Sequence, residues 1–600
     1  GAISRVPAPA HVELSLDGLA RTPRTPTHTS PHAPAPPGRW VFTLGMLTAA
    51  VLLSACGGSG DATQLNAAQP GALANCSTLT SAFSYSNTAI ASASVVAAGT
   101  LSNAGAAVGE HCVVSGKMNQ RVSSVDGQTY AIGFEMRLPK DWNGRFLYQA
   151  NGGTDGVVSQ AVGNISAGGM LRHALQQGFA VISSDAGHSA AQNPLFGLDP
   201  QARLDYGYQA VGTLTPMAKA LVKAAYGRGP DRAYIGGTSN GGRHTMVAAA
   251  RYSNDYDGFL AGSPGFNLPK AAVAQLYGAQ QWATVATDRN NLETGFTTAE
   301  RTMVAAAILA KCDALDGAQD GLVDDVEACR TAFDLQRDVP TCSGARDGTC
   351  LSSAQKTAYG NVMTGARNSK GEALYARWPY DPGVRTTGWA DWKFRNSVGS
   401  SRDPVAVGFI FSSPPASSSI LSDTLSYALN FNMDVDAPKI FATSGIYTES
   451  AISFMTPPNP TKLNNLRDRG AKMIVFQGNA DPVFSIDDTT AWYDALDTEY
   501  SGNAKRFVRL FRVPGMNHSR GGPATDQFDA LAALVAWVEN GQAPDSIVAS
   551  ARGAGNAGGV NADVPADWNP ARTRPLCPYP LKARYKSGDK EVASSFACEK

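Results

Sequence analysis

Residues 236–242, Gly-Gly-Thr-Ser-Asn-Gly-Gly, decide how the rest of this sequence is interpreted. They follow a short apolar run at residues 233–236 and precede a helical stretch at residues 243–252. Within them, Gly-Thr-Ser-Asn-Gly fits the pattern Gly-X-Ser-X-Gly, in which a sharp turn from a strand into a helix lifts a serine hydroxyl above a sheet. The pattern therefore predicts that Ser239 is a nucleophile. The alternative is an ordinary glycine-rich turn, since the chain contains 61 glycines.

Strand-like runs and helices alternate on both sides of this turn. The apolar runs lie at residues 145–150, 179–183, 472–476 and 506–513, and an amphipathic helix is expected at 525–539, ending before Gly541. Short apolar strands that alternate with helices indicate a mostly parallel sheet covered on both faces. Together with the serine turn, this pattern predicts an α/β fold with an α/β-hydrolase core.

The alternation breaks at residues 265–465. This segment holds four cysteines and many Pro, Gly and Ser residues, without a regular succession of strands and helices. A chain of 600 residues also exceeds what one hydrophobic core usually needs. We therefore expect the core to be divided, with its first part at 76–264, an inserted lid domain at 265–465 and its second part at 466–600.

The N-terminal residues are not expected to belong to this fold. Residues 1–38 are rich in Pro, Thr, Ser and Ala and are predicted to be disordered. An apolar run at 40–55 is too short to span a membrane but suits a signal peptide, here placed at 39–56. It ends in Leu-Ser-Ala-Cys, so Cys56 is predicted to be lipidated and 57–75 to be a flexible linker. A plain secretory signal is the alternative, and both interpretations predict export, to the outer membrane as a lipoprotein or to the periplasm or medium.

The remaining cysteines are expected to form disulfides, because their number is even and the chain is exported. They are Cys76, Cys112, Cys312, Cys329, Cys342, Cys350, Cys577 and Cys598. Sequence neighbours would close short loops, but many other pairings stay open. Basic and acidic residues number 50 each, so the net charge is zero and gives no reason to expect nucleic acid as a partner. We expect a monomer that acts on a small substrate and contacts the membrane only through its lipid anchor.

A serine nucleophile needs a base to accept its proton. In α/β-hydrolases the acid and then the histidine follow the serine along the chain. His518 follows Ser239 in this order and lies just after a strand-like run. His188 precedes Ser239, and His244 lies on the helix directly after it, so His518 is the predicted base.

The acid is expected after the strand-like run at residues 472–476. Asp481 lies there, with Asp487 and Asp488 as alternatives. Acyl transfer also needs N–H donors for the oxyanion. Asn240 would supply the N–H after the nucleophile, and Gly152-Gly153, after an early strand, would supply the second donor.

Residues 313–325, Asp-Ala-Leu-Asp-Gly-Ala-Gln-Asp-Gly-Leu-Val-Asp-Asp, contain five aspartates separated in part by glycines. Such a segment can turn several oxygens toward a hard cation, although its spacing is not that of an EF-hand. A calcium loop and a solvated acidic turn fit the pattern equally well.

Several longer motifs resemble the tannase/feruloyl esterase family, over roughly residues 75–600. They lie at residues 236–243, 256–264, 514–518, 521–523 and 574–580. Within the family the sequence is most similar to hydrolases of terephthalate half-esters. The resemblance implies hydrolysis of an aromatic carboxylic ester, with mono(2-hydroxyethyl) terephthalate as the expected substrate and gallate or ferulate esters as the alternative.

The resemblance also implies specific residues. It assigns the catalytic positions to Ser239, Asp481 and His518, and it implies the four neighbouring disulfide pairs. It further implies a structural Ca²⁺ in the lid, with no organic cofactor. The calcium ligands would be Asp313, Asp316, Ala318, Asp320 and Leu322, with Ala318 and Leu322 acting through their carbonyls.

The substrate-binding residues are implied less completely. Trp392 from the lid and Phe484 beside the acid match aromatic residues that hold the substrate ring. The arginine that grips the terephthalate carboxylate has no clear match, and Arg395 and Arg402 are the two candidates.

One departure from the family concerns a disulfide beside the active site. The family usually has a cysteine before the nucleophile and another after the base. This chain has Thr238 and Ser519 at those positions. We therefore expect a less rigid site.

Overall fold

The computed structural model describes residues 63–165 and 168–600. The disordered segment predicted at 1–38, the signal peptide at 39–56 with Cys56, and residues 57–62 of the linker lie outside the described residues. In the described part, no helix has both the length and the apolar character needed to cross a membrane.

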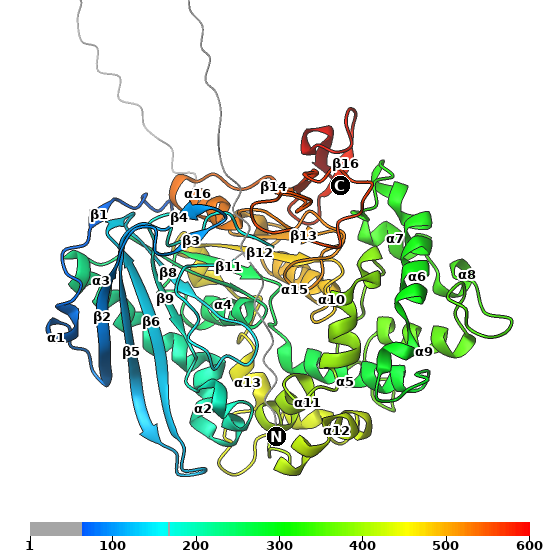
Figure 1. Ribbon diagram of the computed structural model, residues 1–600, viewed down its shortest axis with the longest axis horizontal. Coiled ribbons are helices and arrows are strands. Elements are labelled where there is room, and N and C mark those ends of the chain that lie inside the picture. The colour runs from blue at the N-terminus through cyan, green and yellow to red at the C-terminus, as the bar shows by residue number, and fades with distance from the viewer. Residues whose placement is uncertain (1–62, 166–167) are drawn as a thin grey trace, which may run out of the picture. The chain divides into compact units, whose positions relative to one another are not determined.

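A nine-stranded sheet runs through the described chain (Figure 1). Six neighbouring strands are parallel: β13 (Val508–Val513), β12 (Lys472–Gly478), β11 (Gly258–Gly262), β10 (Arg232–Thr238), β8 (Arg145–Gln149) and β9 (Ala180–Ser184). Three antiparallel strands extend the sheet beyond β9: β6 (Thr129–Pro139), β5 (His111–Val122) and β2 (Thr88–Val96). The predicted mostly parallel sheet is therefore confirmed, with an antiparallel edge that the sequence pattern did not indicate.

Helices cover both faces of this sheet. The first face carries α3 (Ala210–Tyr226), α4 (Asn240–Arg251) and α15 (Ile486–Glu499), and the second carries α16 (Ala530–Asn540). Successive strand residues point to opposite faces. In β12, for example, Met473 and Val475 belong to the first core, whereas Ile474 and Phe476 belong to the second. Because both faces are buried, these strands appear in the sequence as continuous apolar runs.

The predicted helices are present with shifted starts. The helix expected at 525–539 begins only at Ala530, because Asp529 caps it by accepting from the Ala532 N–H. Just before it, Gln527 forms a β-bridge with Ser550. Its end agrees with the sequence, since Gly541 adopts the left-handed conformation that closes a helix.

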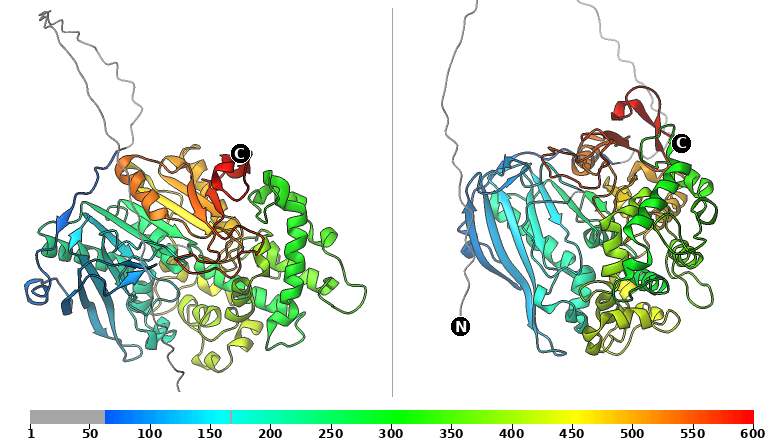
Figure 2. Two further views of the ribbon diagram at one scale, coloured as in Figure 1. Left: turned by 45° about the horizontal axis from the view of Figure 1, so that its top comes forward. Right: turned by 45° about the vertical axis from the view of Figure 1, so that its right-hand side comes forward.

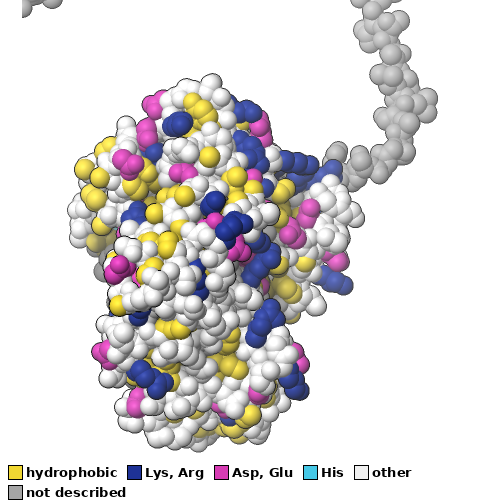
Figure 3. All heavy atoms as spheres, turned by 90° about the vertical axis from the view of Figure 1, so that its right-hand side faces the viewer, with side chains coloured by type: hydrophobic (Ala, Val, Ile, Leu, Met, Phe, Trp, Pro, Cys, Tyr) yellow, Lys and Arg dark blue, Asp and Glu magenta, His cyan; other side chains and the backbone are white. Residues whose placement is uncertain are grey.

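Residues 265–465, which we call the insertion, lie between β11 and β12 and add helices but no strand. Its α-helices are α5 (Leu268–Ala283), α6 (Thr298–Cys312), α7 (Val326–Ala332), α8 (Leu335–Asp338), α9 (Ser353–Thr364), α10 (Thr387–Ala390), α11 (Asp403–Val405), α12 (Thr424–Asn430) and α13 (Ala451–Met455); α14 (Asn464–Asp468) follows at its end. Helices α6–α9 lie on the side opposite β2, β5 and β6 (Figures 1 and 2). On the face that carries them, basic and acidic side chains lie interspersed (Figure 3).

Aromatic side chains fill the centre of the insertion. Trp282 of α5 lies within 5.5 Å, ring centroid to centroid, of both Phe296 and Phe394. Trp389 packs edge-on against Phe394 at 5.8 Å. This cluster also includes Val483 and Phe484, so the insertion and the loop after β12 share one apolar core.

Four disulfides join the eight cysteines as sequence neighbours. They are Cys76–Cys112, Cys312–Cys329, Cys342–Cys350 and Cys577–Cys598. Two of them lie in the insertion, and Cys312–Cys329 encloses the aspartate-rich segment at residues 313–325.

A buried ion pair ties α16 to the sheet. The Glu539 carboxylate accepts two hydrogen bonds from the Arg145 guanidinium, at 2.7 and 3.0 Å, and a third from the Tyr234 hydroxyl at 2.6 Å. Its side chain is 1% exposed. Because the carboxylate and the Tyr234 hydroxyl are buried and Arg145 is only 22% exposed, removal of the carboxylate leaves a partly buried cation and a buried hydroxyl without this partner.

We predict that Glu539→Ala lowers the free energy of unfolding by about 3 kcal/mol, because Arg145 then lacks its partner. Chemical denaturation measures this loss. The control is Asp545→Ala. The Asp545 carboxylate pairs with the Arg509 guanidinium at 3.1 Å, but the Asp545 side chain is 96% exposed, so its loss should cost little stability. Equal stability of the two variants would contradict the prediction.

Candidate active site

Ser239 occupies the turn between β10 and α4 in a strained conformation, with φ 64° and ψ −122°. Its N–H donates to the Gly262 carbonyl at 2.9 Å, and its own carbonyl accepts from the Gly265 N–H at 3.1 Å. Glycine is required on both sides of it. A Cβ at Gly237 would lie 2.3 Å from the Ala150 carbonyl oxygen, and one at Gly241 would lie 2.4 Å from the same atom.

His518 and Asp481 complete a chain of hydrogen bonds to this serine. The His518 Nε2 lies 2.8 Å from the Ser239 Oγ, and its Nδ1 lies 3.0 and 3.1 Å from the two Asp481 oxygens. Both side chains come from loops at the carboxyl ends of strands, Asp481 after β12 and His518 after β13. The parallel register of β11, β12 and β13 brings these loops to the same edge of the sheet as the serine turn.

The Asp481 carboxylate is buried and held by further donors. It accepts from the backbone N–H groups of Val483 and Phe484, at 2.9 and 3.2 Å, and from the Gln477 amide at 3.2 Å. These bonds fix the carboxylate so that it can orient the imidazole.

The alternative acids lie elsewhere. Asp487 pairs with Arg330 and Arg377, and Asp488 accepts from Asn267. Both residues are in the first turn of α15, and neither has a hydrogen bond to His518.

The two other histidines considered in the sequence are buried in different contacts. His188 stacks on Phe196, with ring centroids 3.5 Å apart, and burial lowers its pKa to about 4. His244 lies 2.7 Å from the carboxylate of Asp155. The sequence pattern gave no indication of Asp155, because it is 89 residues from its partner.

Asn240, whose backbone N–H is the first predicted oxyanion donor, is the first residue of α4. Its backbone N–H belongs to the first turn of α4, where N–H groups have no acceptor within the helix. Its side chain donates to the Asn151 carbonyl at 3.1 Å and to Asp155 at 2.9 Å. These bonds hold the start of α4 against the loop that contains Gly152 and Gly153, the second predicted donor segment.

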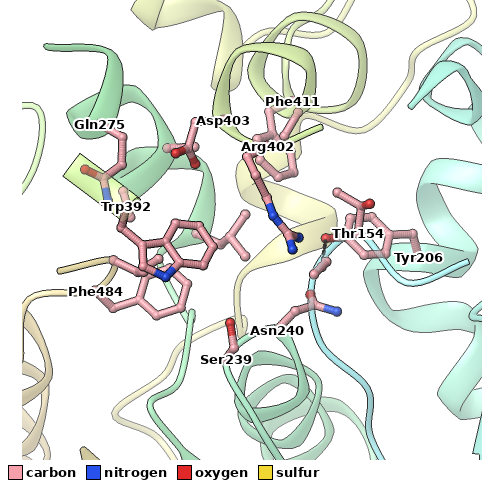
Figure 4. A pocket seen from close by; sticks show the side chains of 16 residues that line it. Thr154, Tyr206, Ser239, Asn240, Gln275, Trp392, Arg402, Asp403, Phe411 and Phe484 are labelled. Carbon is pink, nitrogen blue, oxygen red and sulfur yellow. Dashed lines mark hydrogen bonds between the residues drawn. The ribbon is translucent and has the colours of Figure 1, made fainter. Parts of the chain in front are cut away.

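A cavity opens above Ser239 (Figure 4). Ser239 and Asn240 lie at its base, Trp392 and Phe484 on one side, and Arg402 projects from the insertion toward them. The remaining lining residues are Gly153, Thr154, Tyr206, Leu268, Ala271, Ala272, Gln275, Asp403, Ala406, Phe411 and Val483. Gly152 does not line the cavity, whereas Gly153 does.

Both predicted aromatic residues contact the imidazole. The rings of Trp392 and Phe484 each lie 5.4 Å from the His518 ring, with interplanar angles of 75°. The two rings therefore lie together on one side of the cavity, next to the imidazole, one contributed by the insertion and one by the loop after β12.

The structure separates the two candidate arginines. Arg402 lines the cavity, with its guanidinium 5.6 Å from the Trp392 ring centroid. Arg395 does not line it: its guanidinium pairs with Glu293 at 2.7 Å and with Asp391, and the side chain is 46% exposed. Of the two, only Arg402 is placed to meet a ligand in this cavity.

The aspartate-rich segment forms a loop held mainly by its own backbone. Asp313 accepts from the N–H groups of Asp320 and Gly321, and Asp316 accepts from that of Ala318. Asp320 pairs with Arg574 at 2.7 Å. Burial and neighbouring carboxylates raise the pKa of Asp316 to about 8. Closely spaced carboxylate oxygens that repel one another fit a hard cation. Among residues 63–165 and 168–600, however, no three acidic, His or Cys side chains meet at one point.

Thr238 and Ser519, at the positions where the sequence resemblance implies a disulfide, are not hydrogen-bonded to each other. Ser519 adopts a left-handed φ of 66°, and its buried hydroxyl has no partner.

Comparisons with known proteins identify the family. The model of the family described as "Tannase and feruloyl esterase" matches residues 112–599. The chain is also 41% identical over 529 residues to mono(2-hydroxyethyl) terephthalate hydrolase of Piscinibacter sakaiensis, which covers 82% of this chain and 85% of that protein. The chain belongs to the tannase/feruloyl esterase family. It is therefore a carboxylic ester hydrolase, as the sequence predicted.

Further relatives and solved structures support the assignment to this family. Feruloyl esterase C of Talaromyces stipitatus is 27% identical over 483 residues, covering 76% of this chain and 80% of that protein. Among solved structures, feruloyl esterase B from Aspergillus oryzae matches with a TM-score of 0.68, at 23% identity and over 87% of this chain and 99% of that chain. This structural similarity supports the α/β-hydrolase fold.

Proposed function

We propose that this esterase cleaves aromatic carboxylic esters through an acyl-enzyme on Ser239. The observation that carries the proposal is the continuous hydrogen-bonded chain from Ser239 through His518 to Asp481. A serine hydroxyl is a weak nucleophile by itself, and a base in contact with it removes the proton as the hydroxyl attacks.

In the first step, the Ser239 Oγ attacks the ester carbonyl while its proton moves to the Nε2 of His518. The imidazolium then returns that proton to the departing alkoxide, so the alcohol leaves and an acyl-serine remains. Water repeats the sequence to release the acid. Asp481 faces the imidazolium from the side opposite Ser239, and the N–H groups of Val483 and Phe484 hold its carboxylate in that position.

The oxyanion that forms at each attack needs donors already in place. We assign this role to the N–H of Asn240 and to the Gly152-Gly153 segment. The bonds from the Asn240 side chain to Asn151 and Asp155 join these two elements, and they support the proposal because they fix the donors before substrate binds.

The cavity favours an aromatic acid with a second carboxylate. Trp392 and Phe484 form an aromatic wall beside the serine, against which a flat ring would pack. Arg402 contributes a guanidinium that lies 5.6 Å from the Trp392 ring centroid in the wall of the cavity, and such a group pairs strongly with a carboxylate. A terephthalate half-ester has both features, so mono(2-hydroxyethyl) terephthalate is the proposed substrate.

An alternative substrate class is ferulate or gallate esters without activity on terephthalate half-esters. The similarity to feruloyl esterase C favours this class. The two classes differ at the ring position opposite the ester, which carries a carboxylate in one and a hydroxyl in the other.

We predict that Ser239→Ala lowers the turnover of all aromatic esters by at least about 10,000-fold, because the nucleophile is lost. Hydrolysis of mono(2-hydroxyethyl) terephthalate, methyl ferulate and methyl gallate is measured side by side for the wild type and the variant. Ser422→Ala, an exposed serine of the insertion, is the control. Undiminished turnover in Ser239→Ala would refute the mechanism, and preference for ferulate or gallate would establish the alternative.

We predict that Arg402→Leu raises the KM for mono(2-hydroxyethyl) terephthalate about 10- to 100-fold, because a charge-assisted hydrogen bond is lost. The KM for methyl benzoate, which has no second carboxylate, should change little. Arg395→Leu removes an arginine of the same segment that lies outside the cavity and should leave both values unchanged. Equal losses on the two esters would argue against a carboxylate clamp.

We also propose that the loop of Asp313, Asp316 and Asp320 binds Ca²⁺, with carbonyls of Ala318 and Leu322 completing the set. The raised pKa values of Asp313 and Asp316 support this, because buried carboxylates that repel one another gain from a divalent cation. Such an ion would stabilise the insertion, since the Cys312–Cys329 disulfide encloses the loop.

Removal of calcium is therefore predicted to destabilise the protein. At a Ca²⁺ concentration of one hundred times its Kd, bound Ca²⁺ raises the free energy of unfolding by about 3 kcal/mol and therefore raises the Tm. Thermal unfolding with Ca²⁺ and with a chelator measures it. Asp316→Asn should lose this response, whereas Asp468→Asn, at an exposed position, should keep it. The same Tm with Ca²⁺ and chelator would exclude a structural ion.

Export is the last part of the proposal. Four disulfides are typical of an oxidising compartment, which agrees with a periplasmic or extracellular protein. Lipid attachment at Cys56 would anchor the enzyme to a membrane surface.

A further inference from the structure

Asp403 is a buried carboxyl group in the wall of the cavity above Ser239. It begins α11 and directly follows Arg402. The residue is 9% exposed, and its Oδ2 has no hydrogen-bond partner among the described residues. Figure 4 shows it on the insertion side of the cavity, away from Ser239. Buried polar atoms are rarely left without a partner, so this one indicates a missing donor or acceptor.

The surroundings favour the neutral form of this carboxyl. Burial raises the pKa of Asp403 to about 8, against the opposing influence of Arg402 and Lys393. Lys393 does little to lower the pKa of Asp403 near that pH, because burial lowers the pKa of Lys393 itself to about 7 and leaves it mostly uncharged. At neutral pH the group therefore carries a proton and acts as a hydrogen-bond donor.

Other titratable groups lie on the elements that pack against α11 and across the cavity. Of the helices packed against α11, α5 carries Lys270, which lies over the Phe441 ring, and Tyr277. The other, α12, carries Tyr427, whose pKa is raised by burial. The titratable groups across the cavity are Tyr206, in its wall, and His518, behind Trp392 and Phe484.

A protonated Asp403 and Arg402, which are consecutive in the chain and both line the cavity, would each supply a donor to a ligand there. A carboxylate is the matching ligand, since its two oxygens only accept hydrogen bonds. An ionised Asp403 would instead repel it. A phenolic hydroxyl can donate as well as accept, so it would tolerate either form of Asp403.

We propose that Asp403 is a substrate-binding residue that donates a hydrogen bond from its neutral carboxyl to the distal carboxylate of a terephthalate half-ester, beside Arg402. This inference rests on the proposed function, because it takes the cavity as the substrate site. It makes recognition of the half-ester depend on a single proton.

Equilibrium binding tests the inference without turnover. In Ser239→Ala protein, titration calorimetry measures the Kd of mono(2-hydroxyethyl) terephthalate at pH 7 and pH 9, with methyl benzoate as the ligand that lacks the distal carboxylate. Affinity for the half-ester is expected to fall about tenfold at pH 9, because a group with a pKa of about 8 is then mostly ionised. Methyl benzoate should bind alike at both values.

Two variants in the same background assign the effect. Asp403→Asn keeps an uncharged donor and should abolish the pH dependence. Asp403→Leu removes the donor and should bind the half-ester more weakly than Asp403→Asn at pH 7. Equal affinity of the Ser239→Ala parent at the two pH values, absence of half-ester binding at pH 7, or the same fall in Asp403→Asn would each overturn the inference.

Failure of the proposed function is a separate result. It would appear as wild-type protein that hydrolyses no aromatic ester, or as hydrolysis that survives Ser239→Ala. The binding titrations do not depend on either outcome, so they decide the role of Asp403 independently. Because Asp403→Asn is nearly isosteric, it also keeps the test valid if Asp403→Leu does not fold.

Discussion

The strained turn at Ser239 is the constraint on which the site depends. Its backbone is held from both sides, by the Gly262 carbonyl and by the Gly265 N–H. The Ala150 carbonyl at the end of β8 approaches so closely that only glycine fits at Gly237 and Gly241. The same approach carries the loop after β8 to the start of α4, which places the candidate oxyanion donors beside the serine. Strain of this kind persists only where the surroundings determine the conformation.

Much of this arrangement could be predicted from the sequence because it follows from chain order. The strands are continuous apolar runs, and their carboxyl ends share one edge of the sheet. Asp481 and His518 could therefore be selected as the residues that follow the right strands. The antiparallel edge was missed, because β2, β5 and β6 precede the serine turn and lack the alternation with helices that marks the parallel part.

Other parts of the site could not be predicted, because they depend on contacts across the fold. The pairing of His244 with Asp155 joins residues far apart in the chain. Arg395 and Arg402 are equivalent in the sequence, and only the folding of the insertion directs one to solvent and the other to the cavity. Asp403 carried no signal at all, since its burial results from the packing of α11 against α5.

The cavity is built from two sources. The sheet supplies the serine, the histidine and the aspartate, whereas the insertion supplies Trp392, Arg402 and Asp403. Most of the recognising groups thus lie in another part of the chain than the bond-breaking groups, and Phe484, which follows β12, is the exception. Substitutions in the insertion alone could therefore change the substrate specificity of an ancestral enzyme, while its catalytic residues stayed the same. The same separation lets a protein engineer exchange one stretch without redesigning the other.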